Sequence, residues 1–239
     1  MRYAPLLSLA LFIGCADAPD TPAPDSGTDI AATVPDDLSA LGSASVESLL
    51  ADDPIHVHRV TLAPGDSLPP HEGGERVVYA LGDLPALVFA TGGEREARSF
   101  TAGEVHRHDA GVHSVANESE APGAFVVFER RGALPEAEAE GDTELPDVGE
   151  GVTDEILFDD DFAEVHRVTL QPGASLPPHQ GFARAVYALS GYTVEFTGPD
   201  GTREQRFEAG EAHTHGPGDH TVENAGDTVA EFLVVEFKR

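Results

Sequence analysis

The feature that most constrains this chain is a long internal repeat. The segment from His58 to Leu81 returns as the segment from His166 to Leu189, with 18 of 24 positions identical. A second block, from Phe100 to Asn117, returns as Phe207 to Asn224, with 10 of 18 positions identical. A unit that occurs twice is expected to fold in the same way twice. The sequence therefore predicts two similar domains, each of about 100 residues.

Five histidines stand at matching positions in the two copies. They are His58, His71, His106, His108 and His113 in the first half, and His166, His179, His213, His215 and His220 in the second. A further histidine, His56, has Glu164 at its matching position, so we expect it to carry no role that the halves share. His58 and His166 occupy the same predicted strand and are interpreted as structural histidines. The other eight are candidates for a site.

The chain is strongly acidic. It carries 43 Asp and Glu against 14 Lys and Arg, for a formal net charge of -29. Such a charge repels nucleic acids and anionic lipid surfaces. Most of the carboxylates are expected to form a solvated surface. We therefore expect a small molecule or a metal ion as the partner and no nucleic acid; a homodimer is compatible with this composition.

The N-terminus resembles a bacterial export signal. Arg2 precedes an apolar stretch, Ala4 to Ile13, that is too short to span a bilayer. The single cysteine, Cys15, stands where a lipobox places the cysteine that is lipidated. Residues 1–14 are thus predicted to be a signal peptide. The protein would be an exported lipoprotein of the bacterial cell envelope, on the periplasmic or outer-surface side of a membrane, with the lipid as its only membrane contact. An ordinary cleaved signal and a cysteine placed there by chance are the alternatives.

Composition divides the remainder of the chain. Residues 15–37 are rich in Pro and Asp and are predicted to form a disordered acidic tether. Two domains are predicted, at 38–131 and 152–239, with an acidic linker at 132–151. Strand signals within the domains are short and alternate polar with apolar residues, and Gly, Pro and Asp mark the turns between them. Many short strands at this spacing predict an all-β barrel or jelly-roll sandwich.

Each half also resembles the cupin family. Cupins carry one motif that begins with Gly-x5-His and a second that ends with His-x3-Asn. The first motif is matched by Gly65 with His71 and by Gly173 with His179, and the second by His113 with Asn117 and by His220 with Asn224. The resemblance implies two tandem double-stranded β-helix barrels of the jelly-roll type.

The resemblance also implies a metal site. In metal-binding cupins, two histidines and a glutamate of the first motif and the histidine of the second hold one divalent ion. This chain keeps the first and last of these ligands, which are His71 with His113, and His179 with His220. Two imidazoles alone make a weak site for Zn, Fe, Mn, Cu or Ni, which usually need three or more protein ligands.

The other two ligands of the family are replaced in both halves. Gly73 and Gly181 stand in place of the second histidine, and Arg76 and Arg184 in place of the glutamate. A guanidinium repels a divalent cation, but in a partly apolar pocket it can bind a carboxylate or phosphate through two hydrogen bonds. We therefore consider both arginines as ligand-binding residues. Alternatively, each extends to the rim and pairs with a surface carboxylate.

Two further pairs of histidines are candidate metal ligands. His106 and His108, like His213 and His215, lie two residues apart on a predicted strand, so the two side chains of each pair share a face. If that face points into the barrel, each domain would gather up to four imidazoles. If it points outward, the histidines form a polar stripe on the surface.

Three functions are compatible with this sequence. The first is an exported binding protein that captures a small anionic ligand, a divalent metal or both in its barrels. The second is a metal-dependent cupin enzyme of the dioxygenase or decarboxylase type, similar to the two-domain cupins that act on oxalate or flavonols. The third is an interaction or scaffold protein without a site. Loss of the motif glutamate weighs against the enzyme, and retention of the histidines weighs against the scaffold.

Overall fold

Every regular element in the described part of the chain is a β-strand. The computed structural model describes residues 42–52, 54–91, 94–134, 148–181, 183–216 and 218–238. The predicted signal peptide, Cys15, the tether and the central part of the linker lie outside these ranges. Within them, no helix has the length and apolar character needed to cross a bilayer. The all-β prediction is confirmed.

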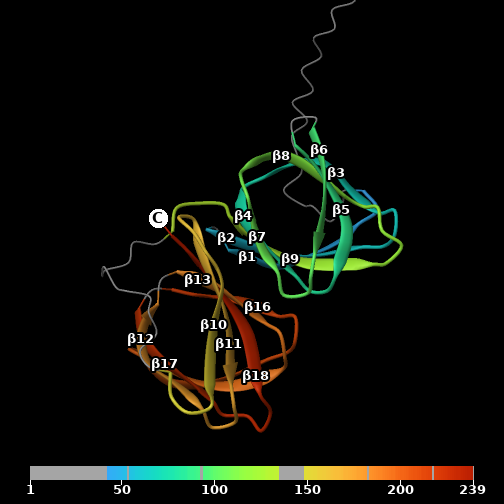
Figure 1. Ribbon diagram of the computed structural model, residues 1–239. Coiled ribbons are helices and arrows are strands. Elements are labelled where there is room, and N and C mark those ends of the chain that lie inside the picture. Colours follow the sequence, from blue (N-terminus) through green and yellow to red (C-terminus); the bar gives the residue numbers. More distant parts are fainter. Residues whose placement is uncertain are drawn as a thin grey trace, which may run out of the picture. The chain divides into compact units, whose positions relative to one another are not determined.

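The first half forms nine strands (Figure 1). They are β1 (Ser45–Asp52), β2 (Ile55–Leu62), β3 (Ser67–Gly73), β4 (Glu75–Ala80), β5 (Leu84–Thr91), β6 (Glu94–Phe100), β7 (Val105–His108), β8 (Gly111–Asn117) and β9 (Gly123–Arg130). The second half repeats them as β10 (Val152–Asp159), β11 (Ala163–Leu170), β12 (Ser175–Gly181), β13 (Arg184–Ala188), β14 (Tyr192–Gly198), β15 (Gly201–Phe207), β16 (Ala212–His215), β17 (Gly218–Asn224) and β18 (Ala230–Phe237).

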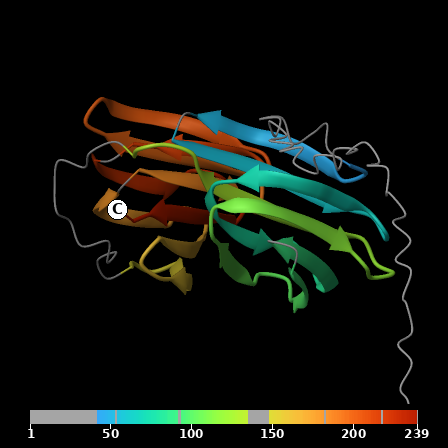
Figure 2. The same cartoon turned by 90° about the horizontal axis from the view of Figure 1, so that it is seen from above.

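The two sets of strands have the same topology. In the first, a five-stranded sheet has the order β1-β2-β9-β4-β7 and a four-stranded sheet the order β3-β8-β5-β6. In the second, the orders are β10-β11-β18-β13-β16 and β12-β17-β14-β15, which match strand for strand. The two sheets of each set face each other (Figures 1 and 2). We call the first set barrel 1 and the second set barrel 2.

A pair of prolines sets the register of the strand that carries the first motif histidine. The pairing of β3 with β8 is regular up to Leu68, breaks across Pro69 and Pro70, and resumes with His71 opposite His113. Proline has no backbone N–H to donate to the ladder, so an irregularity at this place is expected. The same break separates Leu176 from His179 in barrel 2.

The asparagine of the second motif is structural. Asn117 is buried, and its Nδ2 donates to the carbonyl oxygens of Leu62 at 3.0 Å and Ala121 at 2.8 Å. Asn224 makes the matching bonds to Leu170 at 2.9 Å and Thr228 at 2.8 Å. The amide thereby ties the end of β8, or of β17, to a neighbouring strand and to the next turn.

The five-stranded sheets are apolar on both faces. Val78 and Ala80 of β4 belong to the interior core of barrel 1, whereas Val77 and Tyr79 belong to a second cluster on the outer face. That second cluster includes residues of both barrels, among them Val165 of β11. A strand that is covered on both faces has a nearly continuous apolar sequence, which accounts for the unbroken run in β4.

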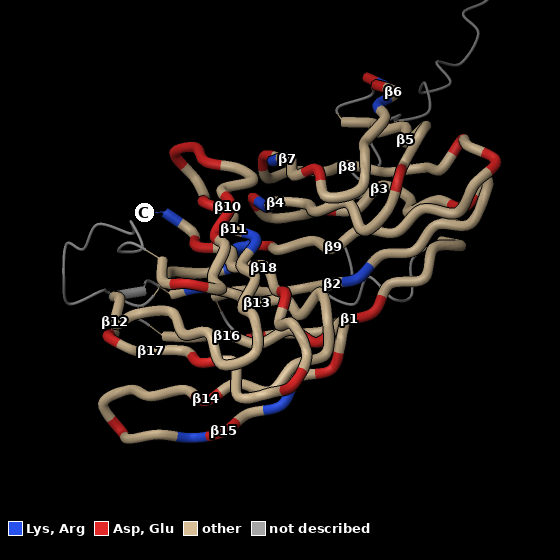
Figure 3. Tube along the Cα trace, turned by 60° about the horizontal axis from the view of Figure 1, so that its bottom comes forward, with Lys and Arg blue, Asp and Glu red and all other residues tan. Residues whose placement is uncertain are grey.

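The charged residues are mostly at the surface. Figure 3 shows acidic positions spread over both sets of strands, many of them at strand ends and turns. Few charged side chains are buried among the described residues. They are Arg76, Glu129, Glu164 and Arg184. These exceptions all lie near the barrel interiors and belong to the candidate sites described next.

Candidate functional site

Barrel 1 encloses a cavity of about 340 Å³. Most of its wall is apolar, with Val60, Leu68, Phe89 and Phe125 among the lining side chains. The polar side chains that line it are His58, His71, Arg76, His106, His108, His113 and Glu129. All five repeated histidines of the first half therefore share this cavity with Arg76 and with one buried carboxylate, Glu129.

Strand register explains why the polar side chains gather. Arg76 on β4 lies opposite Glu129 on β9 and opposite His108 on β7. Glu129 in turn lies opposite His56 on β2. These four residues form one transverse row of the five-stranded sheet. His58 and His106 stand two residues further along their strands and so share the same face.

His71 and His113 form a close pair on the four-stranded sheet. Their ring centroids are 4.1 Å apart. Nδ1 of His71 lies 2.8 Å from the carbonyl oxygen of Pro69, and Nδ1 of His113 lies 3.3 Å from that of Gly111. A ring N–H donates to a carbonyl, so each Nε2 carries the lone pair and is an acceptor. Burial lowers the pKa of His71, and it lowers the pKa of His113 to about 3, so both rings are neutral at pH 7.

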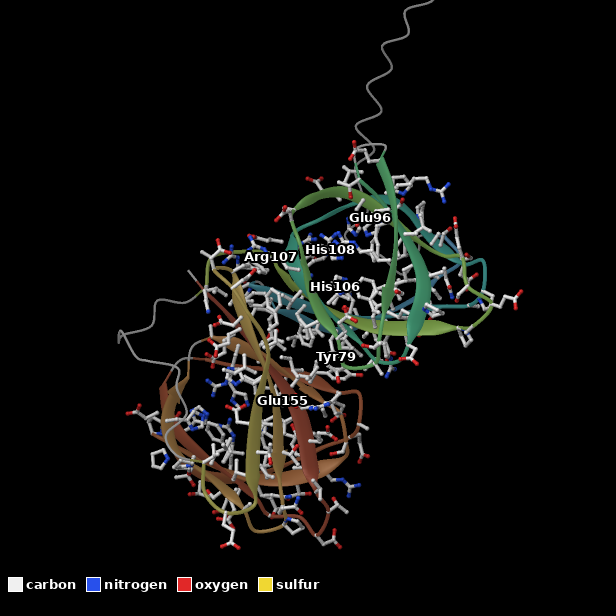
Figure 4. All side chains as sticks on the ribbon, in the orientation of Figure 1. Tyr79, Glu96, His106, Arg107, His108 and Glu155 are labelled. Carbon is white, nitrogen blue, oxygen red and sulfur yellow. The ribbon has the colours of Figure 1, made fainter. Side chains whose placement is uncertain are left out.

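His106 and His108 point into barrel 1, while Arg107 between them points away (Figure 4). His106 stacks on Phe100 with ring centroids 4.1 Å apart. Both ring nitrogens of His106 and Nε2 of His108 are buried without a hydrogen-bond partner among the described residues. Burial lowers the pKa of His106 to about 4 and that of His108 to about 3. Buried polar atoms are nearly always paired, so these nitrogens are available to a bound molecule.

Arg76 is buried in the wall of this cavity, with 5% of its surface exposed. Its Nη1 donates to the carbonyl oxygens of Gly74 at 2.7 Å and Asp109 at 3.4 Å. Burial lowers its pKa and the Glu129 carboxylate opposes that shift, but an arginine starts so far above neutrality that it stays charged. The guanidinium therefore lies in the cavity wall and does not extend to the rim, which was the alternative considered from the sequence.

Gly73 makes room for this guanidinium. A Cβ on Gly73 would lie 2.6 Å from Nη1 of Arg76 and 2.8 Å from Cε1 of His113. Both distances are shorter than side-chain contacts allow. The two departures from the family pattern, glycine for histidine and arginine for glutamate, are therefore one coupled change in barrel 1.

This arrangement does not fit the metal centre of the family. A positive guanidinium occupies the region where that centre would place its glutamate. Among the described residues, the group of three or more His, Cys, Asp or Glu whose ligand atoms lie within 4.8 Å of one another is His56, His58 and Glu129. It includes neither His71 nor His113. Metal binding by the eight histidines of the sequence analysis stays a prediction, which this arrangement does not favour.

Barrel 2 differs from barrel 1 at the matching place. Its cavity is about 70 Å³ and is lined by the predicted residues His179, Arg184, His213, His215 and His220, together with His166 and Glu236. Nη2 of Arg184 donates to Nε2 of His220, whose Nδ1 donates to the carbonyl oxygen of Gly218 at 3.1 Å. Nη1 of Arg184 lies 3.5 Å from Glu236. Arg184 is thus engaged by His220 and Glu236, whereas Nδ1 of His213 and Oε2 of Glu236 are buried without a hydrogen-bond partner among the described residues.

His166 in barrel 2 is held between two carboxylates. Its Nδ1 lies 2.9 Å from Asp154, and its Nε2 lies 2.8 Å from Glu164. Burial alone would lower the pKa of His166, but the hydrogen bonds and charges of Asp154 and Glu164 outweigh burial and raise it. The structural role expected for His166 agrees with these bonds.

Sequence reasoning missed the buried carboxylates. Glu129 is 3% exposed, and the matching Glu236 pairs with Arg184. Their positions correspond because Glu129 lies opposite Arg76 and Glu236 lies opposite Arg184. A glutamate kept in the last strand of both halves was the signal that could have found them. His56 was set aside because it is not repeated.

Comparison with known proteins supports the fold. No family model and no curated protein sequence matches this chain. Among solved structures, AerE from Microcystis aeruginosa is 17% identical, with 82% of this chain and 93% of that chain covered and a TM-score of 0.60. Oxalate decarboxylase from Bacillus subtilis, which has Mn(II) centres, is 16% identical, with 83% and 73% covered and a TM-score of 0.60. A cupin 2 conserved barrel domain protein from Leptotrichia buccalis is 16% identical, with 82% and 89% covered and a TM-score of 0.50.

Identities this low show the fold alone. The order of the strands is the same in both halves, and the match extends over four fifths of the chain. The fold of this chain is the jelly-roll barrel of the cupins, present twice in tandem.

Proposed function

We propose that barrel 1 binds a small organic acid and that Arg76 holds its carboxylate. The observation that carries this proposal is a buried guanidinium in the wall of a cavity of about 340 Å³. That volume is at the lower end of ligand pockets, which begin at about 300 Å³. A guanidinium has five N–H donors, more than the carbonyls of Gly74 and Asp109 take up. In a mostly apolar wall, it can hold a carboxylate through two charge-assisted bonds.

The histidines favour a ligand that also carries a hydroxyl group. Nε2 of His71 and Nε2 of His113 are acceptors, because each Nδ1–H donates to a backbone carbonyl. Neutral acceptors side by side bind a group that donates a hydrogen bond. A short hydroxy acid would meet Arg76 with its carboxylate and this pair with its hydroxyl.

One binding site per chain is expected. In barrel 2, Arg184 donates to His220 and lies near Glu236, and the remaining space is about 70 Å³. A ligand would have to displace bonds that the chain already makes. The contrast between the two barrels supports a working cavity in barrel 1 only.

Calorimetric titration of the full chain with short mono-, di- and hydroxycarboxylates tests this proposal. We expect one site per chain. Arg76→Gln should weaken it by about 10- to 100-fold, because a hydrogen bond to a charged group contributes about 1.5–3 kcal/mol. Arg184→Gln is the matched control and should not change the affinity. Thermal melting checks that both variants fold, and Arg76→Lys, which keeps the charge, is a second variant. Absence of binding by any of these acids, or an equal loss in the Arg184 variant, would contradict the proposal.

The alternatives lead to different results in the same assay. A metal-dependent dioxygenase or decarboxylase would consume one of the acids when the chain is supplied with metal, and a scaffold protein would neither bind nor convert any of them. The likeness to oxalate decarboxylase does not favour the enzyme, because the chain is only 16% identical to it.

We also propose that the protein is exported and carries a lipid on Cys15. The proposal rests on the sequence LFIGC after a short apolar stretch. Cys15→Ser should release the protein from the membrane fraction of a bacterial host into the soluble fraction. Unchanged partitioning between the two fractions would reject the lipid anchor.

A further inference from the structure

A group of metal-ligand type lies in barrel 1 away from the position that the family uses. One ligand atom each of His56, His58 and Glu129 lies within 4.8 Å of the other two. The two histidines project from the same face of β2, and Glu129 stands directly opposite His56 on β9. His71 and His113, by contrast, belong to β3 and β8 of the other sheet.

We propose that His56, His58 and Glu129 bind one divalent transition-metal ion. Two imidazole nitrogens and one carboxylate oxygen form a donor set that Zn²⁺ uses in sites that keep a further position open. His58 and Glu129 line the cavity of barrel 1, so the open position of the ion would face that cavity. All three ligands stand on regular strands, which hold their backbones in fixed register.

Barrel 2 has different residues at the matching place. Glu164 stands where barrel 1 has His56, and Asp154 stands where barrel 1 has Val46. These two carboxylates occupy both ring nitrogens of His166, so the charge of the imidazolium is balanced within the chain. In barrel 1 both carboxylates are replaced, one of them by a second imidazole. The change converts a site for a protonated histidine into a set of metal ligands.

Two cations near Glu129 affect how the ion binds. Arg131 lies 3.4 Å from the Glu129 carboxylate, and Arg76 interacts with it electrostatically. Both repel a divalent ion, and an anion in the same cavity would offset that repulsion. If barrel 1 also binds an organic acid, which is the proposed function above, acid and metal should each strengthen the binding of the other. The metal site itself does not depend on that function.

The test uses the full chain, freed of metal with a chelator and titrated with Zn²⁺ or Co²⁺ alone. We expect one ion per chain, and a Co²⁺ absorption spectrum of nitrogen and oxygen ligands at low coordination number. His56→Gln and Glu129→Gln should each weaken the ion by at least about 100-fold, since even loss of an outer-shell partner of a metal ligand costs 10- to 100-fold. Glu223→Gln, at an exposed glutamate of β17 in barrel 2, is the matched control for Glu129→Gln and should leave the affinity unchanged.

Two results would overturn the inference. One is the absence of any bound ion in the unmodified chain. The other is loss of the ion in His71→Gln with retention in His56→Gln, which would assign the ion to the family position. Melting curves of the metal-free variants check folding. Because the readout is the metal alone, failure of organic acids to bind would leave this result unaffected.

Discussion

At the scale of single residues, the site of barrel 1 depends on the space that Gly73 leaves for the side chains of Arg76 and His113. Gly73 has no side chain where Arg76 and His113 converge, and a Cβ there would meet both within 2.8 Å. Arg76 could not keep its place beside a histidine at position 73. In this chain, the position of Arg76 therefore requires glycine at position 73.

Gly73→Ala tests this coupling. The methyl group should displace the guanidinium, the flexible end of a long side chain, and weaken carboxylate binding while the barrel still folds. In an Arg76→Ala background, the same methyl should meet only Cε1 of His113, so it should destabilise the chain less than it does beside Arg76. Residues in contact typically couple by about 0.5–3 kcal/mol, and denaturant unfolding of the four chains of this cycle measures the coupling energy. Additive effects of the two changes would show that they are independent.

At the scale of strands, the sequence predicted the fold well because alternation and turns are local. The two-residue period of β2 and β7 shows that His56 and His58, and His106 and His108, each share a face. The repeat shows that whatever one half forms, the other half forms as well. The metal positions, by contrast, were inferred from a family pattern that supposes a glutamate where this chain has Arg76.

The pairing between distant strands could not be predicted from the sequence. Glu129 becomes a neighbour of His56 and Arg76 only because β9 lies between β2 and β4. The difference between the barrels depends on bonds such as that of Arg184 to His220, two residues that lie 36 positions apart in the sequence. Matching positions in the repeat suggested equal sites, and single substitutions such as Glu164 for His56 made them unequal.

At the scale of the whole molecule, the buried histidines should control how stability depends on pH. Burial lowers the pKa of His106, His213 and His220 to about 4, and that of His108 and His113 to about 3. It lowers the pKa of His215 to about 2. In the unfolded chain these groups bind protons near pH 6.5. Between that pH and the lowered values, the unfolded state therefore binds more protons than the folded state.

The free energy of unfolding should consequently fall as the pH drops from about 6.5 towards 4, with a slope of more than one proton. His166 acts in the opposite direction, because its pKa is raised in the folded chain. Its contribution to the free energy of unfolding is complete below about pH 6.5 and is lost as the pH rises through the pKa of the folded state. Urea unfolding at a series of pH values measures both effects. A flat profile between pH 4 and 6.5 would show that these imidazoles are solvated rather than buried.

The outer faces of the two five-stranded sheets share one apolar cluster, in which Val77 and Phe128 of barrel 1 join Val165 and Leu233 of barrel 2. Side chains of barrel 1 also bond to barrel 2: Nη1 of Arg107 donates to Asp160 at 2.9 Å, and Nη1 of Arg130 donates to the carbonyl oxygen of Lys238 at 2.8 Å. The five-stranded sheet of each barrel thus covers the outer apolar face of the other. The outer face of barrel 2 therefore helps to bury the outer face of barrel 1, whatever the interior of barrel 2 binds. A change inside barrel 2, such as the bond of Arg184 to His220, leaves this outer face as it is, with Tyr187 packed against Phe128 of barrel 1.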